Sequence, residues 1–386
     1  MTPNDPALQR LIDRVQMAAA AGAQLCIRGG GSKDFYGELP QGEVLDTRVL
    51  EGISSYEPTE LVVTARCGTS LAELEAVLAE KGQCLPFEPP HFGDAGSAGA
   101  TVGGMVAAGM AGPSRAAVGA VRDHVLGATL LNGRGDVLTF GGQVMKNVAG
   151  YDVSRLLAGS LGTLGVILEV SMKVMPVATA TLTVRMEMDE AGALAQLNAW
   201  GGQPLPLNAS AWWDGNLIVR LRGALAAVQA ARVRIGGELV EASFAEPFWS
   251  GLRDHRDEFF VKAHTAVNAV NAGNAVDAGS AGSAVSAGAS LWRLSVPQTA
   301  PPLGLAGELL IEWGGAQRWL CSRLAASLVR DTTARAGGHA TLFRAADKSA
   351  GVFAPLQSPL DRIHRELKKS FDPQGIFNPG RLYPGL

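Results

Sequence analysis

The spacing of apolar and polar residues predicts a chain of short helices and strands. In residues 6–21 and 70–81 the apolar positions recur every three to four residues, as on one face of an amphipathic helix. Each run stops at a glycine, Gly22 or Gly82, which is typical of a helix end. Ser70, with a glutamate three residues later, predicts a capping box at the start of the second helix. Strand-like runs are expected at residues 24–28, 44–46 and 61–65.

Glycines alternate with strand-like runs from residue 99 to residue 172. Residues 126–131 and 137–140, joined by a turn of sequence NGRGD, predict a β-hairpin. A short helix is expected to start within residues 100–109, and its first amides would suit a phosphate group. Another short helix is expected after Asp152, followed by a strand at residues 166–174.

The second half of the chain alternates strands and helices, a pattern typical of an α+β domain. We expect strands at 181–188, 210–214, 216–223, 291–296, 308–312 and 340–343, and helices at 190–200, 224–235, 321–335 and 359–370. Residues 265–290 contain almost only Ala, Asn, Gly, Ser and Val, and are interpreted as a mobile loop without a catalytic role. The predicted organisation is a first domain over 1–176, a second over 177–354, and a helix and tail over 355–386.

Composition narrows the class of protein. The net charge is −3, from 33 basic and 36 acidic residues, so a nucleic acid is not an expected partner. The four cysteines form no C-x-x-C pair, which argues against an iron–sulfur cluster or a structural zinc site; Cys26 and Cys67 are interpreted as buried thiols. No apolar run reaches the roughly 20 residues that a membrane span needs, and no signal peptide is evident. A cytoplasmic protein is expected.

The run Gly29-Gly30-Gly31-Ser32-Lys33 follows a predicted strand, and its successive N–H groups can form an anion-binding nest. It matches neither the Walker spacing nor the dinucleotide fingerprint, so an NTPase-like module is poorly supported. A simple surface turn is the alternative. Arg115 and Arg122 could neutralise an anion or be solvated charges. The many glycines up to residue 172 together favour a large, flat, polar ligand.

Five blocks in order resemble one family: IRGGGSK, EPTELVVTARCGTSLAELEAVL, ATVGGMVAAG, KNVAGYDVSRLLAGSLGTLGVILEV and FDPQGIFNPGR. They are similar to the FAD-linked oxidases of the vanillyl-alcohol oxidase and D-lactate dehydrogenase type, and most similar to the FAD-binding E subunits of bacterial glycolate oxidase (glycolate dehydrogenase). The resemblance implies an α+β fold, with a two-subdomain PCMH-type FAD-binding domain and an α+β cap domain built on an antiparallel sheet.

The resemblance also implies which residues contact FAD. Residues 28–33 would form the pyrophosphate loop, and others would lie along the dinucleotide or return from the tail. The implied set is Arg28, Gly29, Gly30, Gly31, Ser32, Lys33, Thr101, Gly103, Gly104, Ser114, Gly119, Asp123, Gly150, Gly162, Gly165, Val166, Ile167, Asn378 and Arg381. Covalently flavinylated relatives carry histidine near the position of Ser32, so noncovalent FAD is expected.

The predicted function is that of an FAD-binding subunit of a glycolate or 2-hydroxy-acid dehydrogenase complex, with a catalytic flavin subunit and an iron–sulfur subunit as partners. A peripheral location on the inner face of the membrane through these partners is an extension of this prediction. Relatives that oxidise 2-hydroxy acids carry two metal-binding histidines around a Gly-Asp-Gly-Asn stretch. The nearest match, Trp213-Asp214-Gly215-Asn216, has Ala211 and Ile218 beside it and no histidine, so no metal site is expected.

Two alternatives stay open: a non-catalytic flavoprotein subunit, and a stand-alone FAD-dependent oxidoreductase of another small substrate. No catalytic base is assigned from the sequence. His124, Lys146 and Arg381 could each face the flavin or pack in the core.

Overall fold

The computed structural model describes residues 5–93, 98–142, 152–273 and 288–386. The chain divides into two compact units, which we describe one at a time. The first contains residues 1–111, 119–177 and 355–386, and the second contains residues 112–118 and 178–354. The short segment 112–118 therefore belongs with the second unit, although the sequence around it belongs with the first.

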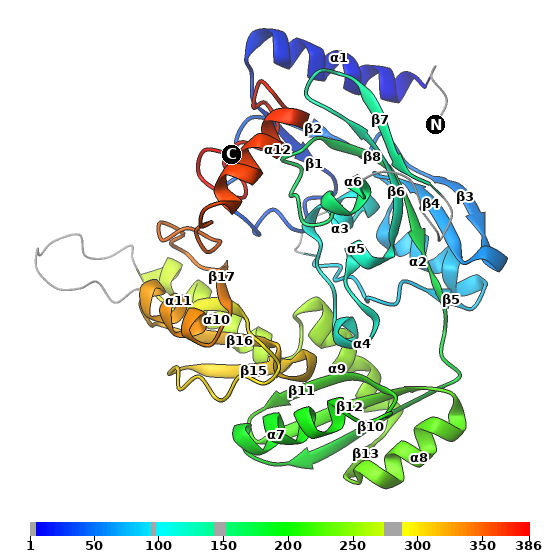
Figure 1. Cartoon of the computed structure of the whole chain (residues 1–386), viewed down its shortest axis with the longest axis vertical. Helices are drawn as coiled ribbons and strands as arrows, with labels where there is room; N and C mark the ends of the chain where they lie inside the picture. The colour runs from blue at the N-terminus through cyan, green and yellow to red at the C-terminus, as the bar shows by residue number, and fades with distance from the viewer. Residues whose placement is uncertain (1–4, 94–97, 143–151, 274–287) are drawn as a thin grey trace, which may run out of the picture. The chain divides into compact units, whose positions relative to one another are not determined.

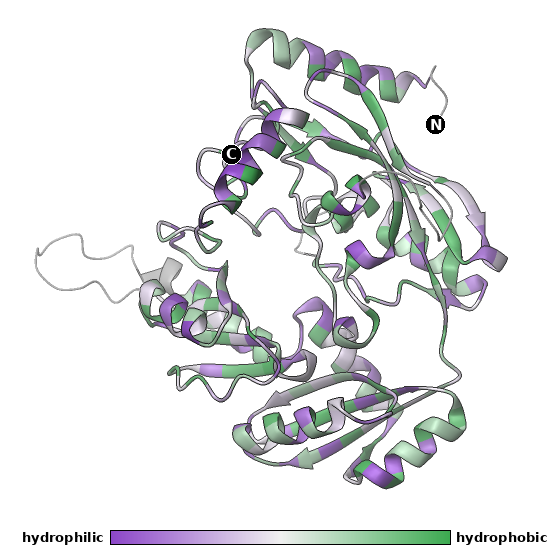
Figure 2. Cartoon of the chain, viewed as in Figure 1, coloured by the Kyte–Doolittle hydropathy of each residue, from purple (hydrophilic) through white to green (hydrophobic). Residues whose placement is uncertain are grey.

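A five-stranded antiparallel sheet forms the core of the first unit (Figure 1). Its order is β3-β4-β8-β6-β7, with β3 at Ile53–Glu57, β4 at Val62–Arg66, β8 at Val166–Lys173, β6 at Val125–Leu131 and β7 at Val137–Gly141. The central strand β8 is buried along most of its length, and β6 and β8 are largely hydrophobic (Figure 2). The predicted hairpin is confirmed as the antiparallel pair β6–β7.

The predicted apolar periodicity is confirmed in the first two helices of the first unit, at residues 6–21 and 71–80. The bounds are α1 Pro6–Ala21, α2 Leu71–Glu80, α3 Val102–Ala108, α5 Val121–His124, α6 Val153–Leu156 and α12 Leu360–Phe371, with the 3-10 turn η1 at Pro58–Glu60. Gly22 ends α1 in the left-handed conformation, with φ of 63°. Ser70 stands at the N-cap of α2, but its side chain makes no capping hydrogen bond, so the predicted capping box is wrong.

A small parallel pair, β1 at Leu25–Arg28 and β2 at Glu43–Asp46, leads into the glycine run. Phe377 of the C-terminal tail extends this pair through a parallel bridge to Leu25. A second short pair joins β5, Gln83–Cys84, to β9, Met175–Pro176. The tail and the first strand, more than 340 residues apart in sequence, are thus hydrogen-bonded neighbours.

The second unit is built on an eight-stranded sheet whose recorded pairs are all antiparallel, as expected for an α+β cap. The order is β13-β10-β12-β11-β15-β16-β14-β17. The strands are β10 Ala180–Glu187, β11 Leu207–Trp213, β12 Asn216–Gly223, β13 Glu238–Val240, β14 Ser290–Ser295, β15 Glu308–Glu312, β16 Gln317–Ser322 and β17 His339–Arg344. The helices are α4 Arg115–Val118, α7 Glu190–Gly201, α8 Leu225–Ile235, α9 Ala242–Asp254, α10 Glu258–Gly273 and α11 Ala326–Arg335, with the 3-10 turn η2 at Trp313–Gly315.

Apolar side chains from the helices pack on the sheet in two clusters. One joins α7 and α8 to β10 and β12 and includes Val184, Trp200 and Val219. The other joins α11 to β14, β16 and β17 and includes Trp292 and Leu320. Each cluster buries its helices against a different half of the sheet, which gives this unit the apolar area that stabilises it.

Two expectations about the second unit are wrong. Residues 317–322 form strand β16, so the helix expected from Cys321 begins only at Ala326. β16 pairs with both β14 and β15, and these two partners determine its conformation. The expected mobile loop is helical in its first part, because α10 continues to Gly273. Its alanines favour helix, and Val267 is buried against the unit.

Candidate functional site

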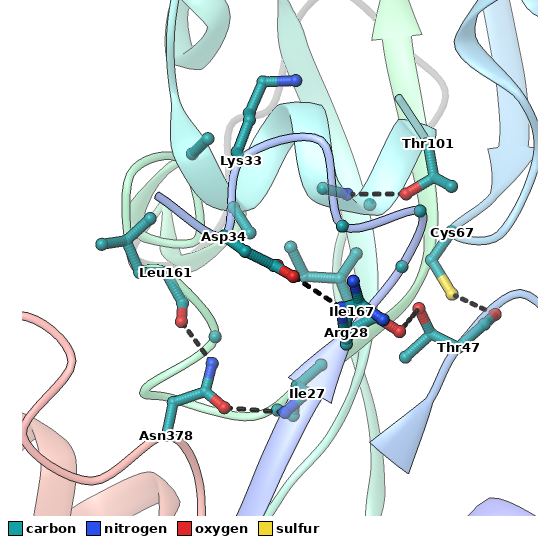
Figure 3. A pocket seen from close by; sticks show the side chains of 18 of the residues that line it. Ile27, Arg28, Lys33, Asp34, Thr47, Cys67, Thr101, Leu161, Ile167 and Asn378 are labelled. Carbon is teal, nitrogen blue, oxygen red and sulfur yellow. Dashed lines mark hydrogen bonds and ion pairs between the residues drawn. The ribbon is translucent and has the colours of Figure 1, made fainter. Parts of the chain in front are cut away.

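The glycine run lines a cavity in the first unit (Figure 3). The loop of residues 28–34 leaves the end of β1 and bends across α3 and the chain before β8. The cavity has a volume of about 110 Å³. Ligand sites commonly measure roughly 300–1,000 Å³, so the enclosed part suits one phosphate-containing portion of a larger ligand.

Close contacts explain why the loop consists of glycines. A Cβ added to Gly30 would lie 1.8 Å from the Gly99 carbonyl oxygen, and one added to Gly29 would lie 2.4 Å from Thr101 Oγ1. Real Cβ atoms do not approach other atoms so closely. Gly31 also has a left-handed φ of 78°. Any larger residue would therefore push the loop away from its neighbours.

The loop presents a row of backbone donors. Among the described residues, none accepts a hydrogen bond from the N–H groups of Gly29, Gly30, Gly31 or Ser32. Gly30 and Ser32 are themselves buried. Buried N–H groups are nearly always paired in folded proteins, so these donors are expected to pair with a ligand. A row of successive backbone N–H groups is typical of an anion-binding site.

The first amides of α3 are already used within the protein. Gly103 N donates to Cys67 O at 2.8 Å, Val102 N donates to Thr69 O at 3.0 Å, and Gly104 N lies 3.3 Å from Thr101 Oγ1. The expectation that these amides hold a phosphate is therefore wrong. These hydrogen bonds instead hold α3 against the chain after β4. The glycines of α3 line the cavity and leave space in it because they have no side chain.

Residues of the C-terminal tail hold the loop in place. Asn378 Oδ1 accepts from Ile27 N at 2.7 Å, while its Nδ2 donates to Leu161 O at 2.6 Å. Arg381 donates to the carbonyl oxygens of Asp34, at 2.8 Å, and of Glu38. Burial lowers the pKa of the Arg381 guanidinium, and these carbonyls compensate for the lost water. Both side chains line the cavity but serve mainly to position it.

Lys368 anchors the tail itself. Its ammonium donates to Thr163 O, Phe377 O and Asp372 Oδ2, at 2.7–2.8 Å. Asp372 in turn accepts from the backbone N–H groups of Ile376 and Phe377. Burial lowers the pKa of Lys368, but the adjacent carboxylate favours its charged form.

Few charges face the cavity. Arg28 is paired with Asp34 at 2.7 Å, and both side chains are about half exposed. The Lys33 ammonium lies 5.6 Å from the centre of the Phe92 ring. Burial raises the pKa of Cys67 to about 12, so this cavity-lining side chain stays a neutral thiol, as expected from its apolar surroundings. Binding of an anion here must therefore depend chiefly on backbone N–H groups.

The structure gathers most of the expected site residues around this cavity. The lining includes Arg28, Gly29, Gly30, Gly31, Ser32, Lys33, Thr101, Gly103, Gly104, Gly162, Gly165, Ile167, Asn378 and Arg381. Val166 is not among them, because adjacent residues of a strand face opposite sides and Val166 is fully buried on the other side of β8. Gly150 and Lys146 lie outside the described residues.

Three other expected residues are also absent from the described lining. Gly119 and Asp123 form a local turn, in which Asp123 Oδ2 accepts from Ala120 N at 2.8 Å. A Cβ on Gly119 would lie 2.9 Å from that carboxylate, which explains the glycine without a ligand. Ser114 is buried within the segment that belongs to the second unit.

Sequence reasoning missed several lining residues: Ile27, Asp34, Thr47, Cys67, Ala107, Ala108 and Leu161. They come from five separate segments and are mostly small or apolar. Five of them, Ile27, Cys67, Ala107, Ala108 and Leu161, lie inside the recognised blocks, and Asp34 directly follows one, so the blocks were the available signal. Thr47 reaches the site because β2 pairs with β1, which no local pattern announces.

The remaining candidate side chains do not line the described cavity. His124 is buried and packs against the Phe87 ring at 5.3 Å. Arg115 lies over the Trp313 ring at 4.4 Å, and Arg122 is exposed. His255 stacks on Phe260 at 3.6 Å, and burial lowers its pKa well below the usual value. In the described parts of the chain, no three His, Cys, Asp or Glu side chains are grouped as metal ligands would be.

The stretch Trp213-Asp214-Gly215-Asn216, the nearest match to the metal-binding motif of the catalytic relatives, is a hairpin turn. Asp214 and Gly215 both have positive φ, 49° and 75°, and connect β11 to β12 with Trp213 paired to Asn216. This is the geometry that two-residue hairpin loops favour. The motif is therefore accounted for by chain reversal.

Comparison with known proteins identifies the class. Residues 7–141, which contain the glycine loop and α3, match the family model described as an FAD binding domain. The structure is similar to alkyldihydroxyacetonephosphate synthase, with a TM-score of 0.62 over 96% of this chain and 75% of that one. At 16% identity, this likeness concerns the fold alone. The family match thus places the chain among the FAD-binding flavoproteins.

More specific relatives are found among sequences. The chain is 45% identical over 378 residues, 98% of each protein, to glycolate oxidase subunit GlcE of Escherichia coli (strain K12). It is 29% identical over 171 residues to glycolate oxidase subunit GlcD of Bacillus subtilis, which covers 44% of this chain and 35% of that protein. The chain belongs to the GlcE family of FAD-binding oxidoreductase subunits. Every helix that the structure describes is too short or too polar to span a lipid bilayer.

Proposed function

We propose that this chain is the FAD-binding subunit of a cytoplasmic complex that oxidises glycolate, and that the FAD pyrophosphate lies against residues 29–32. The row of four N–H groups without a described acceptor is the observation that carries the cofactor site. The relation to subunit GlcE over almost the whole chain supports the choice of complex. When bound, FAD supplies an acceptor for a hydride from a substrate C–H bond.

The residues of this chain bind and orient the cofactor. The loop amides would donate to the pyrophosphate oxygens, while Arg28 and Lys33 of the same loop would offset part of the negative charge. Asn378 and Arg381 would keep the loop in its binding conformation through their contacts with backbone. The expected partners are a catalytic flavin subunit and an iron–sulfur subunit, and the expected substrate is a small 2-hydroxy acid.

Gly104 offers a direct test of the cofactor site. Gly104 lines the cavity, and a Cβ there meets only Thr101 Oγ1, at 3.1 Å, so we expect the rest of a larger side chain to occupy part of the cavity. We expect Gly104→Leu to weaken FAD binding at least tenfold, measured by flavin absorbance and by titration of the apoprotein. Gly93→Leu is the matched control, since a Cβ at Gly93 meets nothing within 4 Å and Gly93 does not line the cavity. Equal FAD occupancy in both variants would disprove the site.

A second candidate is a flavoprotein subunit that assembles or relays electrons without oxidising substrate itself. The hairpin at Asp214 and Gly215 favours it, because Ala211 and Ile218 stand where catalytic relatives would carry metal-binding histidines. The two candidates differ in anaerobic flavin bleaching by glycolate. Bleaching of the isolated, FAD-loaded chain indicates catalysis, whereas bleaching only in the complex indicates the assembly or relay role.

The partnership is tested by isolating the tagged chain from its own cells. We expect a second flavoprotein and an iron–sulfur protein to copurify with it. A monomer that oxidises glycolate at full rate, alone and with oxygen as acceptor, would contradict the proposed complex.

A further inference from the structure

A cavity of about 350 Å³ in the second unit has no part in the proposed function. Its described lining comes from α4, α7, β11, β12, η2 and the loops near them, all within this unit. The volume is at the lower end of the roughly 300–1,000 Å³ typical of small-molecule sites. The cavity is therefore large enough for a compact metabolite.

Uncharged polar side chains define the chemistry of this cavity. Its described lining contains no Asp, Glu, Lys, Arg or His, and its polar members are Asn198, Gln203, Asn208, Ser210 and Gln298. An ionised carboxylate or phosphate would lose its water there and meet no charged side chain of the described lining. The cavity thus disfavours acids, including 2-hydroxy acids, and suits an uncharged ligand.

Two side chains on β11 offer hydrogen-bond donors. Asn208 and Ser210 are 7% and 6% exposed. The Arg220 guanidinium donates to Asn208 Oδ1 at 2.6 Å, and Gly314 N donates to Ser210 Oγ at 2.9 Å. Because these contacts occupy the acceptors, the Asn208 NH2 group and the Ser210 hydroxyl proton are left for a ligand.

Helix α7 and the residues after it offer the complementary acceptors. Asn198 Nδ2 donates to the carbonyl oxygens of Leu194 and Gln298, and Gln203 Nε2 donates to Ala199 O. The amide oxygens of these two side chains therefore remain as acceptors. Trp200, which is 5% exposed, and Val219 supply an apolar part of the wall.

We propose that this cavity binds a small uncharged polyol. A hydroxyl group both accepts and donates, so neighbouring hydroxyls can accept from Asn208 and Ser210 and donate to Asn198 and Gln203. The carbon skeleton would lie against Trp200. A hydrocarbon of the same size would leave those polar groups unpaired, at a cost in affinity. This inference does not depend on FAD or on the proposed complex.

The test compares matched ligands on the full chain by calorimetry or ligand-observed NMR. The probes are erythritol and myo-inositol, with erythronate as the acid counterpart of erythritol. We expect both polyols to bind and erythronate to bind at least tenfold more weakly, because it carries a carboxylate. Absence of polyol binding, or equally tight erythronate binding, overturns the proposal.

Adjacent glycines provide matched variants. A Cβ at either Gly201 or Gly202 meets nothing within 4 Å, but only Gly201 belongs to the described lining. Gly201→Leu should weaken polyol binding more than tenfold, whereas Gly202→Leu should change it less than about twofold. Ser210→Ala, which removes one donor, should weaken binding about fivefold. Unchanged binding in Gly201→Leu and Ser210→Ala, or a crystal soaked in erythritol that shows only water in the cavity, also overturns the proposal.

Discussion

The cavities of the two units differ in the chemical groups that can bind a ligand. In the first unit the donors are backbone N–H groups of a glycine loop, and the neighbouring side chains mostly hold that loop. In the second unit the polar groups are side-chain amides and a hydroxyl. A backbone site is therefore sensitive to any added Cβ and to the residues that hold the loop. A side-chain site is sensitive to removal of the groups that touch the ligand.

The units also differ in how they are stabilised near these sites. Lys368, Asn378 and Arg381 attach the tail of the first unit through hydrogen bonds to backbone, in buried surroundings. The second unit relies on two apolar clusters between helices and sheet. Loss of one polar partner leaves other buried groups unsatisfied, so single substitutions in the tail should have large effects.

The largest effect is expected at the tail anchor. Lys368→Met should lower the free energy of unfolding by about 3–5 kcal/mol, because it leaves the buried Asp372 carboxylate without its cation. Urea unfolding of the full chain measures this. Lys369→Met is the control, since Lys369 is exposed on the same helix and its loss should cost less than about 0.5 kcal/mol. Similar costs for the two variants would refute the special role of the tail anchor.

A single methyl group should disable the backbone site. Gly30→Ala places its Cβ 1.8 Å from the Gly99 carbonyl oxygen, so the loop must shift and its N–H groups lose alignment. We expect FAD affinity to fall about a hundredfold, which corresponds to about 2.7 kcal/mol. Equilibrium titration with FAD gives the value, and Gly93→Ala should match the unsubstituted chain. An unaffected Gly30→Ala would mean that the loop does not contact the cofactor.

In the second unit we expect a pH effect at Asp257. Burial raises its pKa from 3.8 to about 6, so the folded state binds a proton more tightly than the unfolded state. Stability is then greatest below about pH 4 for this group and falls as the pH rises to about 6. Asp257→Asn should raise the free energy of unfolding at pH 7.5 by about 1–3 kcal/mol and have little effect at pH 4. Unfolding curves at both pH values decide this, with exposed Glu246→Gln as the neutral control.

The smallest change in stability is expected when the side chains at the N-caps of two helices are removed. Asp189 caps α7 in the second unit, where its carboxylate accepts from Gly192 N at 2.8 Å, and Asp189→Ala should cost about 1 kcal/mol. Ser70 at the start of α2 in the first unit makes no such bond, and Ser70→Ala should cost less than about 0.5 kcal/mol. Thermal unfolding compares them; a larger loss at Ser70 would restore the predicted capping box.

Features that depend on neighbours along the chain could be predicted from the amino-acid sequence. Helical periodicity placed α1 and α2, and the turn at residues 132–136 announced the hairpin β6–β7. The glycine run marked the loop, because only glycine tolerates a left-handed φ together with close backbone contacts. The family resemblance was also readable, since five blocks kept their order.

Features that depend on residues far apart in the chain could be seen only in the folded protein. The amides of Gly103 and Gly104, predicted to hold a phosphate, instead donate hydrogen bonds to Cys67 O and Thr101 Oγ1. Residues 317–322 form strand β16 because β14 and β15 pair with them on either side, although the local pattern predicted a helix starting at Cys321. The loop itself is positioned by Asn378, 351 residues from Ile27. Local spacing cannot specify such contacts, because their energy is gained only when distant segments meet.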